Sequence, residues 1–440
     1  MDTLGTVSTK MQQIAENAER MPQVSFTSLS YHLDMEWMYE AYKETRKDGA
    51  AGVDGQTAEE FHEELEGNLE NLLELAKSGR YKAPPVRRTY IPKPGSKEER
   101  RPLGIPTFSD KVLQKAVNWL IEPIYETEFY DCSYAFRPNR SQHQALKSLW
   151  KGLMEMDGGW IIELDIRKYF DSIKWKYLSD ILKQRVRDGV LIRLIGKWMN
   201  AGIMEDGELA FHDKGVPQGA VISPLLSNIF LHEVMDKWFH KAVLPRLQGK
   251  AFEVRFADDV RFCFENKADA LRVMEVLPKR LAKYGLEMHP EKTKVVNFTR
   301  PRGDGCDCKR GTRPDTFTFL SFTHFWKRSR KGNPVIARKT DQARVCLALQ
   351  VMNRWCRRNR HMKLSDQHAA LCRKVAGHYA YYGIIGNFVS INNFLYHVER
   401  TWRKWLGRRS WRDKFNWERM RDRVLSNYPL PKPRIAVTWA

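Results

Sequence analysis

Residues 255–264 read RFADDVRFCF and place two adjacent carboxylates between aromatic and β-branched residues. Such residues favour β-strands, in which successive side chains point to opposite faces. In a continuous strand Asp258 and Asp259 would therefore point apart, whereas at the tip of a hairpin both can reach one cation. Adjacent carboxylates repel each other, which makes them natural ligands of a divalent metal ion. The stretch predicts a β-hairpin with a metal-binding tip; the alternative is a solvated turn, in which Asp is common.

A second acidic strand end supports the metal-binding interpretation. Residues 160–166 read WIIELDI, so Asp165 follows an apolar run that predicts a buried strand. A carboxylate in such a place is costly unless a cation or hydrogen-bond donors compensate its charge. Three carboxylates on two strands predict a site for two Mg²⁺ ions, the arrangement that supports in-line phosphoryl transfer. Lys93 and Arg101 offer cations for the triphosphate of a nucleotide substrate.

Helical and strand patterns alternate on the N-terminal side of these strands. Residues 33–76 predict helices, residues 84–107 predict a hairpin with a cationic tip, and residues 110–129 predict a further helix. No Gly-rich dinucleotide-binding fingerprint occurs, so the predicted fold class is α+β, a palm rather than a doubly wound sheet. Residues 1–30 lack strong periodicity and predict a segment that is either loosely ordered or held in place by the partner.

Charge is unevenly distributed along the 440 residues, whose formal net charge is +21. Residues 1–80 hold 7 Lys and Arg against 16 Asp and Glu, whereas residues 341–440 hold 20 against 6. A helical pattern runs from about residue 341 to residue 407, so the positive charge lies on predicted helices. This concentration is typical of a nucleic-acid-binding surface. A solvated basic helical bundle is the alternative.

The seven cysteines are odd in number and lack the spacing of a disulfide framework. Together with the absence of an apolar leader, they predict a reducing compartment and a cytoplasmic location. No run of about 18 apolar residues occurs, so no membrane span is predicted. Cys306 and Cys308 form one short pair without a second Cys or His pair nearby, which argues against a tetrahedral zinc site.

Between about residues 33 and 330, seven segments follow the order of the sequence blocks of one enzyme family. The chain resembles the reverse transcriptases, or maturases, of bacterial group II introns. Phe256 stands where that family usually has Tyr, which keeps the aromatic ring and loses a hydroxyl group. The segments are IPKPGSKEERRPLGIPT (91–107), SYAFRPNRSQHQAL (133–146), LDIRKYFDSI (164–173), GVPQGAVISPLLSNIFL (215–231), RFADDVRFCF (255–264), GLEMHPEKTKVV (285–296) and FLSFTHFW (319–326).

The resemblance implies a right-hand polymerase, in which fingers and a palm with an antiparallel sheet precede an all-helical thumb or maturase domain. Two stretches resemble that helical domain: HYAYYGIIGNF (378–388) and VERTWRKWLGRRSWRDKFNWERMRDRVLSNYPLPKPRI (398–435). The implied divisions are an N-terminal extension (1–32), fingers and palm (33–335), the helical thumb or maturase domain (336–410) and a basic C-terminal segment (411–440).

The resemblance also implies roles for single residues at the metal site. Asp165, Asp258 and Asp259 would be the catalytic metal ligands, joined by the main-chain carbonyl of Ile166. Phe170 would be the steric gate that lies under the sugar and rejects a 2′-hydroxyl group. Without the motif around it, Phe170 would be interpreted as a core aromatic residue.

Further residues are implied for the nucleotide pocket and for the grip on the primer. Lys292 or Lys294 would help to protonate the leaving group, although an exposed lysine without such a role is the alternative. Ser321 stands where the family often has Gly. The implied nucleotide-binding residues are Lys93, Arg101, Phe170, Gln218, Gly219, Lys292 and Lys294, and the implied primer grip is Phe319, Leu320, Ser321 and Phe322.

Tryptophans and cations are interleaved near the C-terminus, and this pattern suits both bases and phosphates of structured RNA. The alternative places the tryptophans in a helical core and leaves the cations solvated, and both can hold in part. The tryptophans are Trp402, Trp405, Trp411 and Trp417, and the candidate RNA-binding cations are Arg403, Lys404, Arg408, Arg409 and Arg412.

The resemblance predicts a bacterial RNA-directed DNA polymerase that uses two Mg²⁺ ions, for which Mn²⁺ can substitute. Its expected partners are an RNA template, a DNA primer, deoxynucleoside triphosphates and structured group II intron RNA whose splicing and mobility it promotes; a dimer stays open. No His-Asn-His-like or Cys-paired zinc endonuclease segment is recognised, so a form without the DNA-nicking module is expected. The alternatives are a host-adopted enzyme of repair or phage defence and an RNA-binding splicing factor with a vestigial polymerase site.

Overall fold

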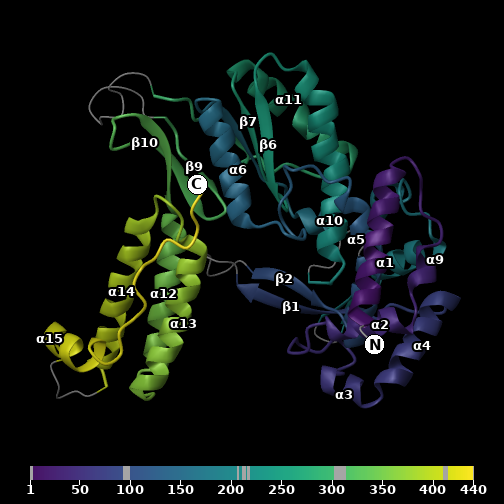
Figure 1. Cartoon of the computed structure of the whole chain (residues 1–440), viewed down its shortest axis with the longest axis horizontal. Helices are drawn as coiled ribbons and strands as arrows, with labels where there is room; N and C mark the ends of the chain where they lie inside the picture. Colours follow the sequence, from purple (N-terminus) through teal and green to yellow (C-terminus); the bar gives the residue numbers. More distant parts are fainter. Residues whose placement is uncertain are drawn as a thin grey trace. The chain divides into compact units, whose positions relative to one another are not determined.

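The computed structural model describes residues 3–92, 100–205, 208–210, 215, 219–301, 314–409 and 415–439. The described chain forms two compact units, each with its own core (Figure 1). The first contains the described residues of Met1–Pro92, Glu98–Ala145 and Trp160–Val295, and the second those of Leu146–Gly159 and Val296–Ala440.

The N-terminal part of the first unit is a group of helices around a buried central helix. α5 (Phe108–Glu126) is covered along most of its length, and α1 (Thr3–Arg20) packs against it. Val7, Ile14 and Ala18 of α1 are buried on one stripe, so the expectation of a loosely ordered segment 1–30 is wrong. The polar residues between them hid this apolar stripe. The other helices are α2 (Met35–Lys43), α3 (Ala58–Glu63) and α4 (Leu65–Ser78), preceded by the short helix η1 (Leu29–His32).

The predicted hairpin at residues 84–107 is confirmed as two antiparallel strands, β1 (Val86–Pro92) and β2 (Arg100–Ile105). They belong to a four-stranded sheet of order β2-β1-β4-β5, in which β4 runs parallel to β1. The remaining strands are β4 (Ile203–Glu205) and β5 (Glu208–Ala210). The helices that lie between α5 and β4 along the chain are α6 (Gln142–Glu155), α7 (Tyr169–Ser172), α8 (Trp175–Leu182) and α9 (Gly189–Met199).

A second four-stranded sheet, of order β6-β7-β3-β8, is the palm that the α+β prediction anticipated, and that fold class is confirmed. Helix α11 lies along this sheet (Figure 1). Ile162 and Phe262 of the sheet are fully buried in the same apolar core as residues of α11. The strands are β3 (Trp160–Leu164), β6 (Ala251–Phe256), β7 (Asp259–Phe264) and β8 (Lys294–Asn297); the helices are α10 (Ser223–Leu231), its π-helical continuations η2 (His232–Asp236) and η3 (Phe239–Val243), the short η4 (Leu244–Arg246) and α11 (Lys267–Lys283).

The second unit joins a three-stranded antiparallel sheet of order β11-β10-β9 to three long helices. The predicted helical region from residue 341 is confirmed, and the implied division after residue 335 lies within β11, a strand in the same unit as these helices. The elements are β9 (Phe317–Phe319), β10 (Phe322–Arg328), β11 (Pro334–Thr340), α12 (Gln342–Arg358), α13 (Leu364–Tyr382), α14 (Phe388–Leu406), α15 (Trp417–Arg419) and η5 (Met420–Leu425).

Two of the interleaved tryptophans belong to the core of the helical region. Trp402 donates from Nε1 to Gln367 Oε1 at 2.8 Å, and Trp405 donates to Asn353 Oδ1 at 2.7 Å. Trp417 is half-buried, and Trp411 lies outside the described residues. In the described part of the chain, none of the helices has the length and apolar character that a membrane-spanning helix needs.

Candidate active site

The acidic tip lies in the two-residue turn between β6 and β7, as the alternation pattern predicts. Phe256 pairs with Asp259 across the ladder, so Ala257 and Asp258 form the turn. Ala257 has a φ of 56°, a conformation that L-residues adopt at a cost and that hairpin turns often give to Gly. The turn therefore presents both carboxylates at the same end of the strand pair.

Asp165 reaches the same edge of the palm sheet from β3. Leu164 pairs with Val260 in the antiparallel register of β3 and β7, so Asp165 and Asp259 follow next on the two strands. Thr293 holds the main chain of Asp165. The Asp165 N–H donates to Thr293 Oγ1 at 3.2 Å, and the same hydroxyl lies 3.3 Å from the Asp165 carbonyl oxygen. The N–H of His289 donates to the same carbonyl at 2.9 Å.

Electrostatics supports a cation at this edge. Burial raises the pKa of Asp258, and the charges of Asp259 and Asp165 raise it further. Burial also raises the pKa of Asp259. Arg261 acts to lower this pKa, whereas the charges of Glu163 and Asp165 act to raise it. Clustered carboxylates that raise the pKa values of Asp258 and Asp259 in this way form a donor set that fits hard divalent cations. Divalent metal ions are the cofactors that such a donor set accommodates.

An internal cation partly compensates the carboxylates. Arg261 donates to Asp259 Oδ1 at 2.6 Å, and its Nη2 lies 3.6 Å from Glu163 Oε1. Glu163 and Arg261 face each other across β3 and β7, and Lys294 Nζ lies 3.0 Å from Glu163 Oε2. Lys294 is thus paired within the palm, so its predicted nucleotide contact stays a prediction. Glu163, Arg261 and Thr293 were not among the predicted site residues. Their signal in the sequence was position alone, since Glu163 and Arg261 lie two residues from a motif aspartate and Thr293 lies between Lys292 and Lys294.

The remaining predicted nucleotide-pocket residues occupy varied environments. The positive charge of Arg101, on β2, lowers the pKa of Asp258, so Arg101 lies within electrostatic range of the carboxylates. Phe170 is half-buried in α7, and its ring meets that of Tyr169 edge-on at 5.2 Å. Lys292 is exposed. Ile166, whose carbonyl is the implied main-chain metal ligand, is buried and forms an antiparallel β-bridge with Met288. Lys93 and Gln218 lie outside the described residues.

Gly219 has a structural requirement that the motif did not reveal. Its φ is +107°, and a Cβ atom placed there would lie 2.8 Å from the carbonyl oxygen of Gly104. No other residue fits this position without a shift of the β2 backbone. The implied role of Gly219 in nucleotide binding stays a prediction.

The predicted primer grip is the turn between β9 and β10 in the second unit. Phe319 pairs with Phe322, and the two central residues, Leu320 and Ser321, have φ values of 47° and 67°. Positive φ at both positions is typical of a type I′ turn, and it explains why Gly is favoured where Ser321 stands. Phe319 and Phe322 are fully buried, so their side chains support the turn from beneath.

The candidate RNA-binding cations divide into exposed and internally engaged groups. Lys404 and Arg408 are exposed, and both lie over the ring of Trp405. Arg409 instead donates to the carbonyl oxygens at the end of α12, including Met362 O at 2.7 Å. Arg403 lies 4.8 Å over the Trp417 ring. Arg412 lies outside the described residues.

An antiparallel palm sheet that brings carboxylates from two strands to one edge is the arrangement typical of nucleic-acid polymerases. The family described as reverse transcriptase (RNA-dependent DNA polymerase) matches residues 91–324, more than half of the chain. The chain therefore belongs to the reverse transcriptase family, whose members generally use divalent metal ions.

Curated relatives support the group II intron resemblance, which is confirmed. The chain is 32% identical over 320 residues to the group II intron-encoded protein LtrA of Lactococcus lactis subsp. cremoris. The aligned region covers 69% of this chain and 52% of LtrA. It is 39% identical over 227 residues to protein YkfC of Escherichia coli K12, an alignment that covers 50% of this chain and 58% of YkfC. Nuclear intron maturase 2, mitochondrial, of Arabidopsis thaliana is 30% identical over 305 residues, covering 57% and 40%. The chain spans about half the length of the curated relatives it matches.

Proposed function

We propose that this chain is an RNA-directed DNA polymerase that copies RNA into DNA by two-metal nucleotidyl transfer. The observation that carries the proposal is the meeting of Asp165, Asp258 and Asp259 at one edge of the palm. Their mutual electrostatic influence supports their role as joint ligands of two ions. Mg²⁺ is the proposed ion, with Mn²⁺ as a substitute.

The chain's own residues would position the reactants. Bound Mg²⁺ supplies activation of the primer 3′-hydroxyl and neutralisation of the leaving pyrophosphate. Thr293 and His289 hold the Asp165 main chain, so this ligand enters the reaction already oriented. Arg101, together with Lys93, would bind the triphosphate, and Phe170 would lie under the sugar and favour deoxynucleotides. Lys292 or Lys294 would assist the departure of pyrophosphate.

We also propose that the chain binds structured group II intron RNA and promotes its splicing and mobility. The names of the intron-encoded and maturase relatives support this role, as do the exposed cations on α14 and beyond. Deoxynucleoside triphosphates, an RNA template and a DNA primer complete the proposed partners. A cytoplasmic location is kept as a proposal and rests on the free thiols of the described cysteines.

Primer extension on an RNA template with deoxynucleotides and Mg²⁺ tests the polymerase proposal. Asp258→Ala and Asp259→Ala should each lower the extension rate by about 1,000-fold, a loss of about 4 kcal/mol of transition-state stabilisation. Asp180→Ala, which removes an exposed carboxylate from α8, is the matched control and should retain the parent rate.

Two other results would contradict the proposal. If both active-site variants extended primers as the parent does, the three carboxylates would not be the catalytic site. If the parent made no DNA but bound RNA tightly, a splicing factor with a vestigial polymerase site would replace the proposed enzyme.

A further inference from the structure

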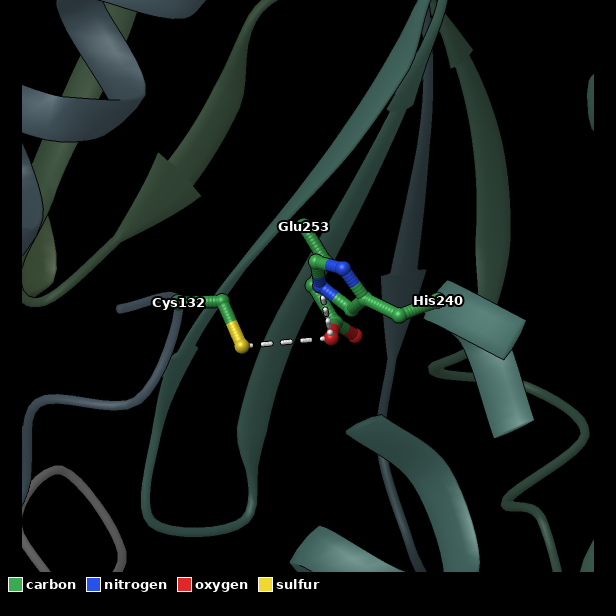
Figure 2. A group of neighbouring side chains, drawn as sticks. All are labelled: Cys132, His240 and Glu253. Atoms are coloured by element: carbon green, nitrogen blue, oxygen red, sulfur yellow. Dashed lines mark hydrogen bonds and ion pairs between the residues drawn. The ribbon is translucent and has the colours of Figure 1, made fainter. Parts of the chain in front are cut away.

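Three potential metal ligands from distant parts of the sequence meet inside the first unit. Cys132 follows α5, His240 lies on the π-helical segment η3, and Glu253 lies on β6 (Figure 2). Figure 2 shows the thiol and the imidazole both directed at the carboxylate. Cys132 Sγ is 3.2 Å and His240 Nε2 is 3.3 Å from Glu253 Oε1. One ligand atom from each residue lies within 4.8 Å of the other two.

These separations suit a tetrahedral zinc site. Zinc bonds of about 2.3 Å to sulfur and about 2.0 Å to nitrogen and oxygen place sulfur and oxygen about 3.5 Å apart, and nitrogen and oxygen about 3.3 Å apart. The observed distances from Glu253 Oε1 match these values within a few tenths of an ångström. The side chains therefore need little rearrangement to surround one ion.

The cluster leaves buried polar atoms unsatisfied. Glu253 is 3% exposed, and its Oε2 has no hydrogen-bond partner among the described residues. His240 Nε2 is also buried without a hydrogen bond of good geometry. An unpartnered buried carboxylate oxygen is costly, and a bound cation would remove that cost.

The neighbouring cation is already engaged. Arg255 donates to both carboxylate oxygens of Asp236, at 2.8 and 2.6 Å, so this buried pair is neutral and complete. A divalent ion balances one thiolate and one carboxylate and leaves the imidazole neutral, so the whole cluster would carry no net charge.

We propose that Cys132, His240 and Glu253 bind a structural zinc ion in the palm. A sulfur, a nitrogen and an oxygen donor together favour borderline-soft Zn²⁺ over the hard Mg²⁺ of the catalytic edge. The His240 side chain is 36% exposed, which leaves a side from which the ion and a water ligand can enter. The ion would link three elements through its ligands: the segment after α5, the helix η3 and the strand β6. β6 leads to the turn that holds Asp258.

Cobalt substitution tests this site in the full chain. The background variant carries Cys306→Ser and Cys308→Ser, which removes the short cysteine pair, and excess Mg²⁺ occupies the catalytic carboxylates. Metal-depleted protein is titrated with Co²⁺, and binding is followed by the thiolate-to-cobalt charge-transfer band. One Co²⁺ per chain with this band is expected, and Zn²⁺ should displace it.

Variants then locate the ligands. Cys132→Ser should abolish the charge-transfer band, whereas Cys263→Ser, which alters another buried cysteine on the neighbouring strand β7, should retain it. His240→Gln and Glu253→Gln should each weaken Co²⁺ binding at least about 10-fold. Zn²⁺ should raise the melting temperature of the background protein but not that of Cys132→Ser.

Two outcomes would overturn the site. One is the absence of a charge-transfer band in the background protein, which would leave Cys132 and His240 as hydrogen-bond partners of Glu253. The other is a band that survives all three ligand substitutions. If Cys132→Ser does not fold, the half-buried His240→Gln decides between the two interpretations, because unchanged affinity in that folded variant contradicts the site.

Discussion

Asp110 illustrates how a single buried group sets a pH dependence. It is 2% exposed on α5, accepts a hydrogen bond from Trp198 Nε1 at 3.2 Å and is also bonded to the Tyr81 hydroxyl. Burial raises its pKa to about 7. The neutral carboxylic acid is therefore the form that the folded protein favours, whereas in the unfolded chain Asp ionises near pH 4.

The sign of the effect follows from proton binding. Below about pH 4 both states hold the proton of Asp110, so its contribution to stability is fully present, and it is lost as the pH rises to about 7. Asp110→Asn should remove this loss and shrink the difference in the free energy of unfolding between pH 5 and pH 8 by about 2 kcal/mol. Urea unfolding at the two pH values measures it.

The exposed Asp180→Asn is the control for this pH dependence, and its pH difference should equal that of the parent. An unchanged difference in Asp110→Asn would mean that Asp110 ionises in the folded protein as it does in the unfolded chain.

Lys168 has a strained backbone conformation three residues after Asp165. It is exposed, and its φ of 44° and ψ of 46° place it in the left-handed region at the start of α7. Lys168→Gly should raise the free energy of unfolding by about 1 kcal/mol, because Gly relieves this strain. Lys168→Ala removes the same side chain but keeps the strain, so it should match the parent in denaturant unfolding. Equal stability of the Gly and Ala variants would show that the strain is negligible.

Among the elements, the helices of the second unit depend on one buried amide. Gln367, on α13, is 2% exposed, and its Nε2 donates to carbonyl oxygens that follow α12, with distances of 2.7 Å to Asn359 and 3.2 Å to Met362. Its Oε1 accepts from Trp402 of α14. One side chain therefore links three helices whose amphipathic patterns alone do not set their packing.

Gln367→Ala should lower the free energy of unfolding by about 3 kcal/mol, because it leaves the buried Trp402 N–H without its acceptor and removes a donor from the carbonyls after α12. Hydrogen exchange should show the loss of protection concentrated in α12–α14. Gln342→Ala, at an exposed position of α12, is the control and should change stability by less than about 0.5 kcal/mol. Similar small effects of both substitutions would remove Gln367 from this role.

At the scale of the whole molecule, charge is segregated along the chain. The first 80 residues carry a net charge of −9 and the last 100 carry +14. The structure further divides the basic residues, since Lys404 and Arg408 are exposed whereas Arg409 holds the end of α12. Only the exposed group is free to exchange counterions for phosphates.

Lys404→Ala and Arg408→Ala should each weaken RNA binding and reduce the slope of log affinity against log salt by about 1, measured between about 50 and 200 mM salt. Lys77→Ala, an exposed cation of the acidic N-terminal region, should leave the slope unchanged. Arg409→Ala should instead lower stability, because it removes the donors to the carbonyls after α12. A salt slope unaffected by both Lys404→Ala and Arg408→Ala would contradict an RNA-binding role for this surface.

The sequence by itself determined the α+β class, the hairpin that carries Asp258 and Asp259, and the family. These features are local or ordered along the chain, since strand alternation, a two-residue turn and successive motifs can be identified without knowing what packs against what. It also led to the wrong expectation for residues 1–30, because the apolar stripe of α1 becomes evident only against α5.

Tertiary structure alone decided which distant residues meet. Cys132 and Glu253 are 121 positions apart, Thr293 holds Asp165 from 128 positions away, and Arg409 reaches back 49 positions to α12. Such contacts depend on how strands pair and helices pack, and the periodicity of any one segment contains no information about its partner. The carboxylates were therefore predictable from the sequence, whereas the residues that position them and the buried Cys132, His240 and Glu253 cluster were not.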